Sequence, residues 1–223
     1  MKLKNRLLRI TCDGGAATGK STGAKMIANK YKLAFLSSGL LYRYVSYLIL
    51  KYKPNNKISF IKKKFKNLNY KKINKINLHT PKISAETANI AKSLRIRNIL
   101  KKYQKSFIKK NKGCVLEGRD ASTEILPTSD VKFYFTCNLN IAAKRRYKEL
   151  EKKSKKIKFN EIKLALFRRN LMDRKRKISP LQKHPDAVVV NTSNLDRRAM
   201  IVKMSVYIDK FLKKYGDRRT DKK

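Results

Sequence analysis

Short apolar runs alternate with stretches of helical spacing along most of this 223-residue chain. The runs are apolar enough to be buried on both faces, which is typical of strands in a parallel sheet. A helix is expected after the first run, where "GAKMIANKY" (23–31) has helical spacing. This alternation predicts an α/β fold with a parallel central sheet covered by helices, in which ligands bind at the carboxyl ends of the strands. The expected strands are residues 7–11, 33–39, 113–118, 131–137 and 187–192.

Two strongly charged segments interrupt the alternation. Residues 53–82 are rich in lysine and in turn-forming residues, with short apolar patches, and predict a small insert on the core. Residues 144–183 are typical of two helices joined by a polar connection at Ser154. The end of the chain, residues 216–223, is expected to be disordered. The length suits one domain with a substantial core, so we expect a single domain over residues 1–223.

The stretch "CDGGAATGKST" (12–22) lies between the first predicted strand and the first predicted helix. It fits the pattern G-x-x-x-x-G-K-[ST], whose backbone N–H groups cradle phosphates. In this pattern Lys20 reaches the terminal phosphates, Ser21 offers its hydroxyl to Mg²⁺, and the positive end of the helix faces the anion. An ordinary glycine-rich turn is the alternative. The flanking strand and helix favour a triphosphate site formed by Gly14, Gly15, Ala16, Ala17, Thr18, Gly19, Lys20, Ser21 and Thr22.

The chain is very basic, with 58 Lys+Arg against 15 Asp+Glu and a net charge of +43. Such a charge makes nucleic acid or an anionic membrane surface a natural partner. However, lysine occurs in nearly every segment, together with the Asn, Ile, Tyr and Phe that AT-rich codons encode, and no basic stripe with regularly interleaved aromatics stands out. We favour genome base composition as the cause, and expect no dedicated nucleic-acid partner and no membrane partner.

The three cysteines, Cys12, Cys114 and Cys137, lie in or beside predicted strands and lack metal-ligand spacing. Buried, reduced thiols indicate a reducing compartment. No apolar run is long enough to span a membrane, and the basic start of the chain leads into a strand rather than a signal-peptide core. We therefore expect a cytoplasmic protein.

Arginine is less common than lysine in this chain, so an arginine in a distinctive position suggests a need for a planar, bidentate donor. Several arginines and polar residues follow predicted strands or share one face of a predicted helix. An ordinary solvated face is an equally good interpretation of the helical set. The residues are Ser38 and Arg43, then Arg119 and Asp120, then Arg169, Asp173 and Arg176 at helical spacing.

Beyond the glycine loop, five further stretches resemble the bacterial-type cytidylate kinases, which are P-loop nucleoside monophosphate kinases. They occur in the order and spacing of that family, cover nearly the whole chain, and make the resemblance specific. The stretches are "SSGLLYR" (37–43), "ETANIAKSLRIR" (86–97), "EGRDASTEILPTSDVKFYF" (117–135), "AAKRRYKEL" (142–150) and "RRNLMDRKRKISPL" (168–181).

The resemblance implies a P-loop NTPase fold with a three-layer αβα arrangement, and Mg²⁺-dependent transfer of the γ-phosphoryl group of ATP to CMP or dCMP by a monomer. It implies an insert on the monophosphate side at about 53–91 and a helical lid at about 144–183. The implied monophosphate site consists of Ser38, Arg43, Arg97, Arg119, Asp120, Arg169 and Asp173. Within it, the three arginines that bind or approach the acceptor phosphate are Arg43, Arg119 and Arg169, and the carboxylates that hold cytosine and sugar are Asp120 and Asp173. The implied catalytic cations are Lys20 together with the lid residues Arg145, Arg146 and Arg176.

The chain departs from the family pattern at three places. Ser37 stands where the family usually has an aspartate, Ala142 stands where an arginine is expected, and Ser93 or Lys92 takes the position of a substrate serine. These departures leave acceptance of UMP open. Two alternatives also remain open: a P-loop kinase for another small acceptor, and a nucleic-acid-binding protein in which the charge itself is the function.

Overall fold

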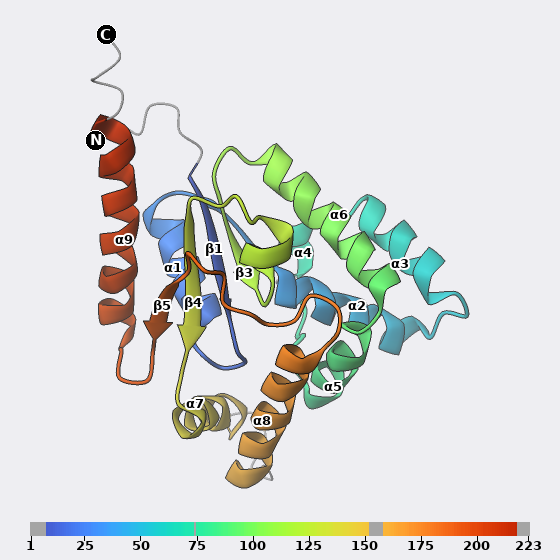
Figure 1. Ribbon diagram of the computed structural model, residues 1–223. Coiled ribbons are helices and arrows are strands. Elements are labelled where there is room, and N and C mark those ends of the chain that lie inside the picture. The colour runs from blue at the N-terminus through green and yellow to red at the C-terminus, as the bar shows by residue number, and fades with distance from the viewer. Residues whose placement is uncertain (1–7, 74, 152–157, 218–223) are drawn as a thin grey trace.

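The computed structural model describes residues 8–73, 75–151 and 158–217, with side chains described as far as residue 214. The five predicted strands are present and form one parallel sheet in the order β2-β3-β1-β4-β5 (Figure 1). The first strand starts and ends later than predicted. The bounds are β1 Arg9–Gly14, β2 Ala34–Ser37, β3 Cys114–Gly118, β4 Val131–Thr136 and β5 Val188–Asn191. The glycine loop therefore follows the central strand, beside the carboxyl ends of both neighbours.

Helices cover both faces of the sheet, which gives the predicted three layers. On one face α1 (Lys20–Lys30) and α9 (Arg197–Asp217) pack with Ile10, Val115 and Phe133 of the sheet. On the other face α2 (Ser38–Tyr52) and α6 (Leu94–Lys110) pack with Leu36 and Leu116. Successive residues of a strand point to opposite faces, so Val115 and Leu116 enter different cores. Figure 1 shows α1 and α9 on one side of the strands and α2 and α6 on the other.

The lysine-rich segment 53–82, for which the sequence predicted an insert without specifying helices, is mainly helical. It contains α3 (Lys57–Lys66) and α4 (Tyr70–Ile73), and α5 (Pro81–Ile90) begins at its end. Asn56 caps α3 by accepting from the Ser59 N–H at 3.0 Å, and Thr80 caps α5 by accepting from the Ile83 N–H at 3.2 Å. Ile61 and Phe65 lie four residues apart and enter the same core as α2 and α6. The density of lysine around these two apolar positions obscured their helical period.

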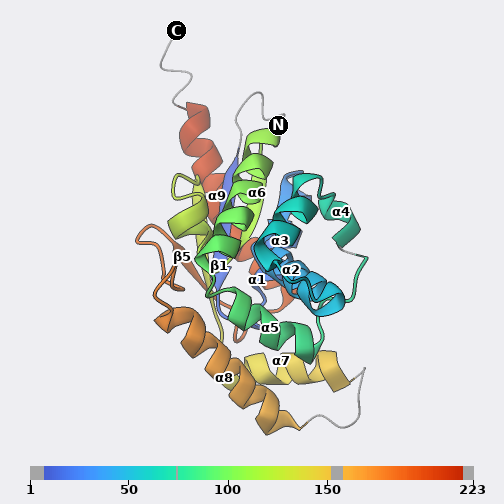
Figure 2. The ribbon, with the colours of Figure 1, turned by 90° about the vertical axis from the view of Figure 1, so that its right-hand side faces the viewer.

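The two predicted helices of the second charged segment are also present. They are α7 (Leu139–Glu151), which begins before residue 144, and α8 (Phe159–Lys175). Ala142, Ala143, Ile162 and Leu166 form a small core between them. Figures 1 and 2 show the pair below the carboxyl ends of the strands. The connection expected at Ser154 lies outside the described residues. The predicted disordered tail, residues 216–223, lies outside them from residue 218 onward. Residues 216 and 217 are described and belong to α9, so that part of the prediction was wrong.

Candidate active site

The glycine loop has the geometry of a phosphate cradle. Gly14, Ala17 and Gly19 have φ of 153°, 57° and 78°, and a Cβ on Gly14 would lie 2.5 Å from the Phe135 carbonyl oxygen. Only glycine fits that close approach to β4. Within the loop, the Thr18 hydroxyl and the Lys20 ammonium both donate to the Gly15 carbonyl, at 3.1 and 3.2 Å. The loop ends where α1 begins at Lys20, so the N-terminus of α1 faces it.

Lys20 is buried beside a carboxylate that the sequence analysis did not single out. Its Nζ lies 3.2 Å from Glu117 Oε1, at the end of β3, and the Ser37 hydroxyl donates to Glu117 Oε2 at 2.5 Å. Burial, with a smaller effect from Arg119, lowers the pKa of Lys20 from 10.5 to about 8 although Glu117 opposes the shift. Lys20 is thus a buried cation in an ion pair with Glu117, and a more negative ligand can replace that partner.

A second buried carboxylate, Asp13, connects the glycine loop to the "GRD" segment. Its two oxygens accept from the backbone N–H groups of Ala121 and Ser122 at 2.8 and 2.7 Å, at the start of the π-helix η1 (Ala121–Ile125). Burial raises the pKa of Asp13 to about 6. This contact fixes Arg119 and Asp120, which precede η1, relative to the loop. Both Glu117 and Asp13 could have been noticed in the sequence, because an acidic residue inside or directly after an apolar strand is uncommon.

Asp173 lies within ion-pair distance of three arginines. Its Oδ2 accepts from Arg119 Nε at 2.8 Å and lies 3.4 Å from Arg169 Nε, while its Oδ1 lies 3.4 Å from Arg176 Nη1. Burial alone would raise the pKa of Asp173, but the three guanidinium groups hold it below its ordinary value. The predicted face of Arg169, Asp173 and Arg176 is therefore a charge cluster and not a solvated surface. Arg176 lies just beyond the end of α8, in extended conformation, instead of on the helix as expected.

Arg43 and Arg169 meet at a residue that gave no sequence signal. Arg43 Nη1 donates to the Ser84 hydroxyl at 2.9 Å and to the Leu78 carbonyl at 3.0 Å, and Arg169 Nη1 donates to the Ser84 carbonyl at 3.1 Å. Burial, reinforced by Arg169 and other nearby arginines, lowers the pKa of Arg43 to about 10. Ser84 of α5 thus joins α2 to α8, and two guanidinium groups face the same region.

Arg97 and Asp120 form a second buried pair. Arg97 Nη2 donates to Asp120 Oδ2, and its guanidinium lies 5.7 Å from the centre of the Tyr42 ring. Nearby, the Ser38 hydroxyl donates to the side-chain oxygen of Gln104. The structure therefore brings all seven predicted monophosphate-site residues to the carboxyl ends of β2 and β3 or to the helices that face them.

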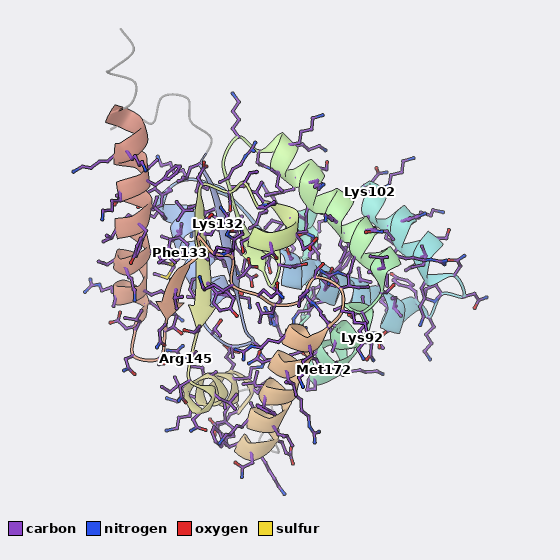
Figure 3. All side chains as sticks on the ribbon, in the orientation of Figure 1. Lys92, Lys102, Lys132, Phe133, Arg145 and Met172 are labelled. Atoms are coloured by element: carbon purple, nitrogen blue, oxygen red, sulfur yellow. The ribbon has the colours of Figure 1, made fainter. Side chains whose placement is uncertain are left out.

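The predicted lid arginines occupy separate places. Arg145 Nη2 donates to the Thr192 carbonyl at 2.6 Å, and its Nη1 would lie 3.9 Å from a Cβ on Gly19, so this side chain borders the glycine loop (Figure 3). Arg146 pairs with Glu149 at 2.9 Å and donates to the His79 carbonyl at 3.4 Å, across from α7 to the segment before α5. Arg176 remains with Asp173. Of the catalytic set, only Lys20 and Arg145 lie at the loop.

The structure also shows where the other residues named in the sequence analysis lie. The Ser93 hydroxyl accepts from the Ile96 N–H at 3.4 Å as the N-cap of α6, while Lys92 is exposed. Ser21 is exposed in the first turn of α1, and Thr22 follows it, half-buried. Across the described ranges, neither a group of three or more His, Cys, Asp and Glu side chains suited to a metal nor a helix able to cross a membrane is found.

Comparison with known proteins identifies the relatives of this chain. The family model described as "Cytidylate kinase" matches residues 10–210. The cytidylate kinase of Thermosipho melanesiensis is 35% identical over 203 residues, which cover 86% of this chain and 93% of the relative. The cytidylate kinase of Bartonella tribocorum is 36% identical over 209 residues, covering 92% and 95%. A crystal structure of an uncharacterized protein from Eubacterium ventriosum matches with a TM-score of 0.51 at 13% identity, covering 92% of this chain and 99% of that one, and supports the fold alone.

Proposed function

The chain belongs to the cytidylate kinase family of nucleoside monophosphate kinases, and we propose that its site transfers the γ-phosphoryl group of ATP to CMP or dCMP. The observation that carries this proposal is the arginine cluster around Asp173, beside the glycine loop. One buried guanidinium nitrogen in it, Arg176 Nη2, has no hydrogen-bond partner among the described residues, and Arg169 Nε has only the 3.4 Å ion pair with Asp173. Buried donors of this kind need an acceptor, and a phosphate or ribose oxygen supplies one.

The ATP side is the glycine loop with Lys20. The loop N–H groups and the start of α1 bind the β- and γ-phosphates, and Lys20 exchanges Glu117 for the more negative triphosphate. Among the site residues, the Ser21 hydroxyl and the Glu117 carboxylate are hard oxygen donors, which suit Mg²⁺ bound mainly through substrate phosphates. We propose that these two residues hold it. There Mg²⁺ would supply positive charge that offsets the negative charge of the triphosphate.

The acceptor side is the arginine cluster. Arg43, Arg119 and Arg169 bind the monophosphate, because their guanidinium groups face one region and can form bidentate contacts with phosphate oxygens. Asp120 and Asp173 hold the cytosine and sugar, each held in place by an arginine: Arg97 for Asp120 and Arg119 for Asp173. No general base is needed, since the attacking phosphate oxygen is already anionic. Catalysis is then a matter of positioning and charge neutralisation for in-line displacement.

The helices α7 and α8 act as the lid, which spans about 144–183. The helical insert at about 53–91 lies on the monophosphate side. Both belong to a single domain over residues 1–223. Arg145 borders the glycine loop, and Arg146 reaches the carbonyl of His79, so closure of α7 excludes water from the transferring phosphoryl group. The ATP side and the acceptor side proposed above need no residue from a second chain, so we propose a monomeric enzyme. The free thiols of Cys12, Cys114 and Cys137 support action in the cytoplasm.

The experiment that tests the function is a coupled ADP-release assay with ATP and Mg²⁺, in which CMP, dCMP, UMP, AMP, GMP and shikimate are offered one at a time. We expect turnover with CMP and dCMP. Lys20→Ala should abolish it, because the cation that follows the migrating phosphoryl group is lost. Lys25→Ala, on the exposed side of α1, is the matched control and should retain activity. Turnover with shikimate alone, or full activity of Lys20→Ala, would contradict the proposal.

A further inference from the structure

A large groove lies outside the catalytic site. It has a volume of about 1800 Å³ and runs between α6 on one wall and α3 with the segment around α4 on the other. Figure 2 shows α3 and α6 side by side on the face turned to the viewer. The groove reaches Ala34 and Phe35 at the amino end of β2, whereas the glycine loop lies at the carboxyl ends of the strands. It is therefore separate from the nucleotide sites.

The lining of this groove is strongly and uniformly basic. It contains eight Lys and Arg side chains and, among the described residues, not one Asp or Glu. Lys101 is paired with Glu124 at 3.2 Å. The other seven have no ion pair within the described part of the chain: Lys62, Lys66 and Lys71 on one wall, and Arg95, Lys102, Lys105 and Lys110 on the other. Seven uncompensated cations on facing walls create a potential that a polyanion neutralises.

Aromatic rings lie between these cations. Tyr70, Tyr103 and Phe107 are half-buried lining residues that pack against the core of α2 and α6. Phe65 is buried beneath them and meets the Tyr103 ring edge-on, with centroids 5.7 Å apart. The rings pack into the core below and are therefore held in place. A positively charged groove with fixed aromatic rings is the arrangement that binds single-stranded nucleic acid without sequence preference.

The helical period explains how α6 forms its wall. Ile99, Tyr103 and Phe107 are spaced by four residues and form one stripe of the helix. Arg95, Asn98, Lys102 and Lys105 are spaced by three or four residues and form the stripe beside it; Lys102 is labelled on α6 in Figure 3. The opposite wall adds Lys62 and Phe65 from a segment distant in sequence. The interleaving of cations with aromatics is thus created by the fold, which is why the sequence did not display it.

We propose that this groove binds an unpaired polynucleotide strand, with the lysines along its phosphodiester backbone and the bases against the aromatic rings. The proposal does not rest on the kinase activity. A free nucleotide offers too few phosphates to neutralise both walls, and a fully stacked duplex keeps its bases from the rings. The remaining possibility is that the groove is basic only because the whole chain is, and the experiment must separate these two cases.

The test compares two variants that each lose four positive charges. The groove variant is K62Q/K66Q/K102Q/K105Q, and the control is K203Q/K210Q/K213Q/K214Q on α9, whose lysines are exposed or half-exposed. Fluorescence anisotropy of labelled oligo(U) and oligo(dT) is measured over a series of salt concentrations, first without nucleotide and then with saturating ADP and CMP to occupy the catalytic site. ADP release and thermal unfolding verify that both variants fold.

We expect the groove variant to bind at least about tenfold more weakly near physiological salt, and its salt slope to fall by about three, because each phosphate contact in a single strand contributes roughly 0.7 to the slope. The α9 control should change by less than about twofold. Equal losses in the two variants would overturn the proposal and attribute binding to total charge. Absence of saturable binding by the unaltered protein, loss of binding when ADP and CMP are added, or equal affinity for a duplex would overturn it as well.

Discussion

The side-chain oxygen of Asn170 accepts a hydrogen bond from the backbone N–H of Ala16 at 2.8 Å, which joins α8 directly to the phosphate loop. A Cβ on Gly15 would lie 3.0 Å from the same oxygen, so this approach also uses the small size of that glycine. Asn170 directly follows Arg169 and lies one helical turn before Asp173. A single contact therefore sets the position of the acceptor-side residues relative to the ATP side.

Asn170→Ala should lower kcat by about tenfold or more, because α8 loses its fixed position against the loop and small misplacements are costly in phosphoryl transfer. Initial rates at saturating ATP and CMP measure the effect. Asn160→Ala, an exposed asparagine on the same helix, is the control. Asn170→Asp keeps the acceptor but adds a negative charge beside the triphosphate site, so the KM for ATP should rise while kcat at saturating ATP recovers most of its loss. If it is as slow as Asn170→Ala, the hydrogen bond is not the cause.

Arg169→Lys should reduce kcat/KM for CMP on the order of 10²-fold. A lysine keeps the charge but cannot contact the Ser84 carbonyl and Asp173 at once while also binding a phosphate, as the planar guanidinium can. The measurement varies CMP at saturating ATP. Arg168→Lys makes the same change at the neighbouring, exposed position. Equal values for the two variants would mean that Arg169 is only a general source of charge.

The sheet and the phosphate loop could be predicted from the sequence because both depend on local patterns. The apolar runs identified all five strands, and the spacing of Gly14, Gly19 and Lys20 identified the loop. The helices of the insert could not be predicted, because the lysines between Ile61 and Phe65 hid a helical period that appears once the buried positions are known.

The residues that connect the site were harder to find. Asn170 and Ser84 are common polar residues on helices, and their roles depend on what lies opposite in the fold: the Ala16 N–H for one and two arginines for the other. Glu117 was discoverable, since a carboxylate within an apolar strand of so basic a chain requires a partner. That partner, Lys20, is distant in sequence, so the pairing itself could not be derived from spacing.

The value of kcat/KM for ATP should decline above about pH 8. The pKa of Lys20 is lowered to about 8, so the ammonium needed for the triphosphate is present below that pH and is lost as pH rises through it. A decline approaching tenfold per pH unit is expected well above the pKa. Lys20→Arg, slower but permanently charged, should show no such decline over the same range. A parallel decline in this variant would assign the titration to another group.

Asp173→Asn should lower the free energy of unfolding by about 3 kcal/mol at pH 7, because Arg119, Arg169 and Arg176 would lose their shared carboxylate in a largely buried site. The pKa of Asp173 lies below its ordinary 3.8 in the folded protein. Its stabilising contribution is therefore complete above that ordinary value and is lost as pH falls through the folded-state pKa.

Chemical unfolding of the unaltered protein and of Asp173→Asn should thus show a difference in the free energy of unfolding that is largest at neutral pH and becomes smaller in acid. Asp186→Asn removes a carboxylate whose side chain is 75% exposed and should cost less than about 0.5 kcal/mol. A deficit of equal size at all pH values would mean that the substitution acts through packing. In that case the arginine cluster would have to be held in place by its contacts to backbone carbonyls, such as that of Ser84, and not by the charge of Asp173.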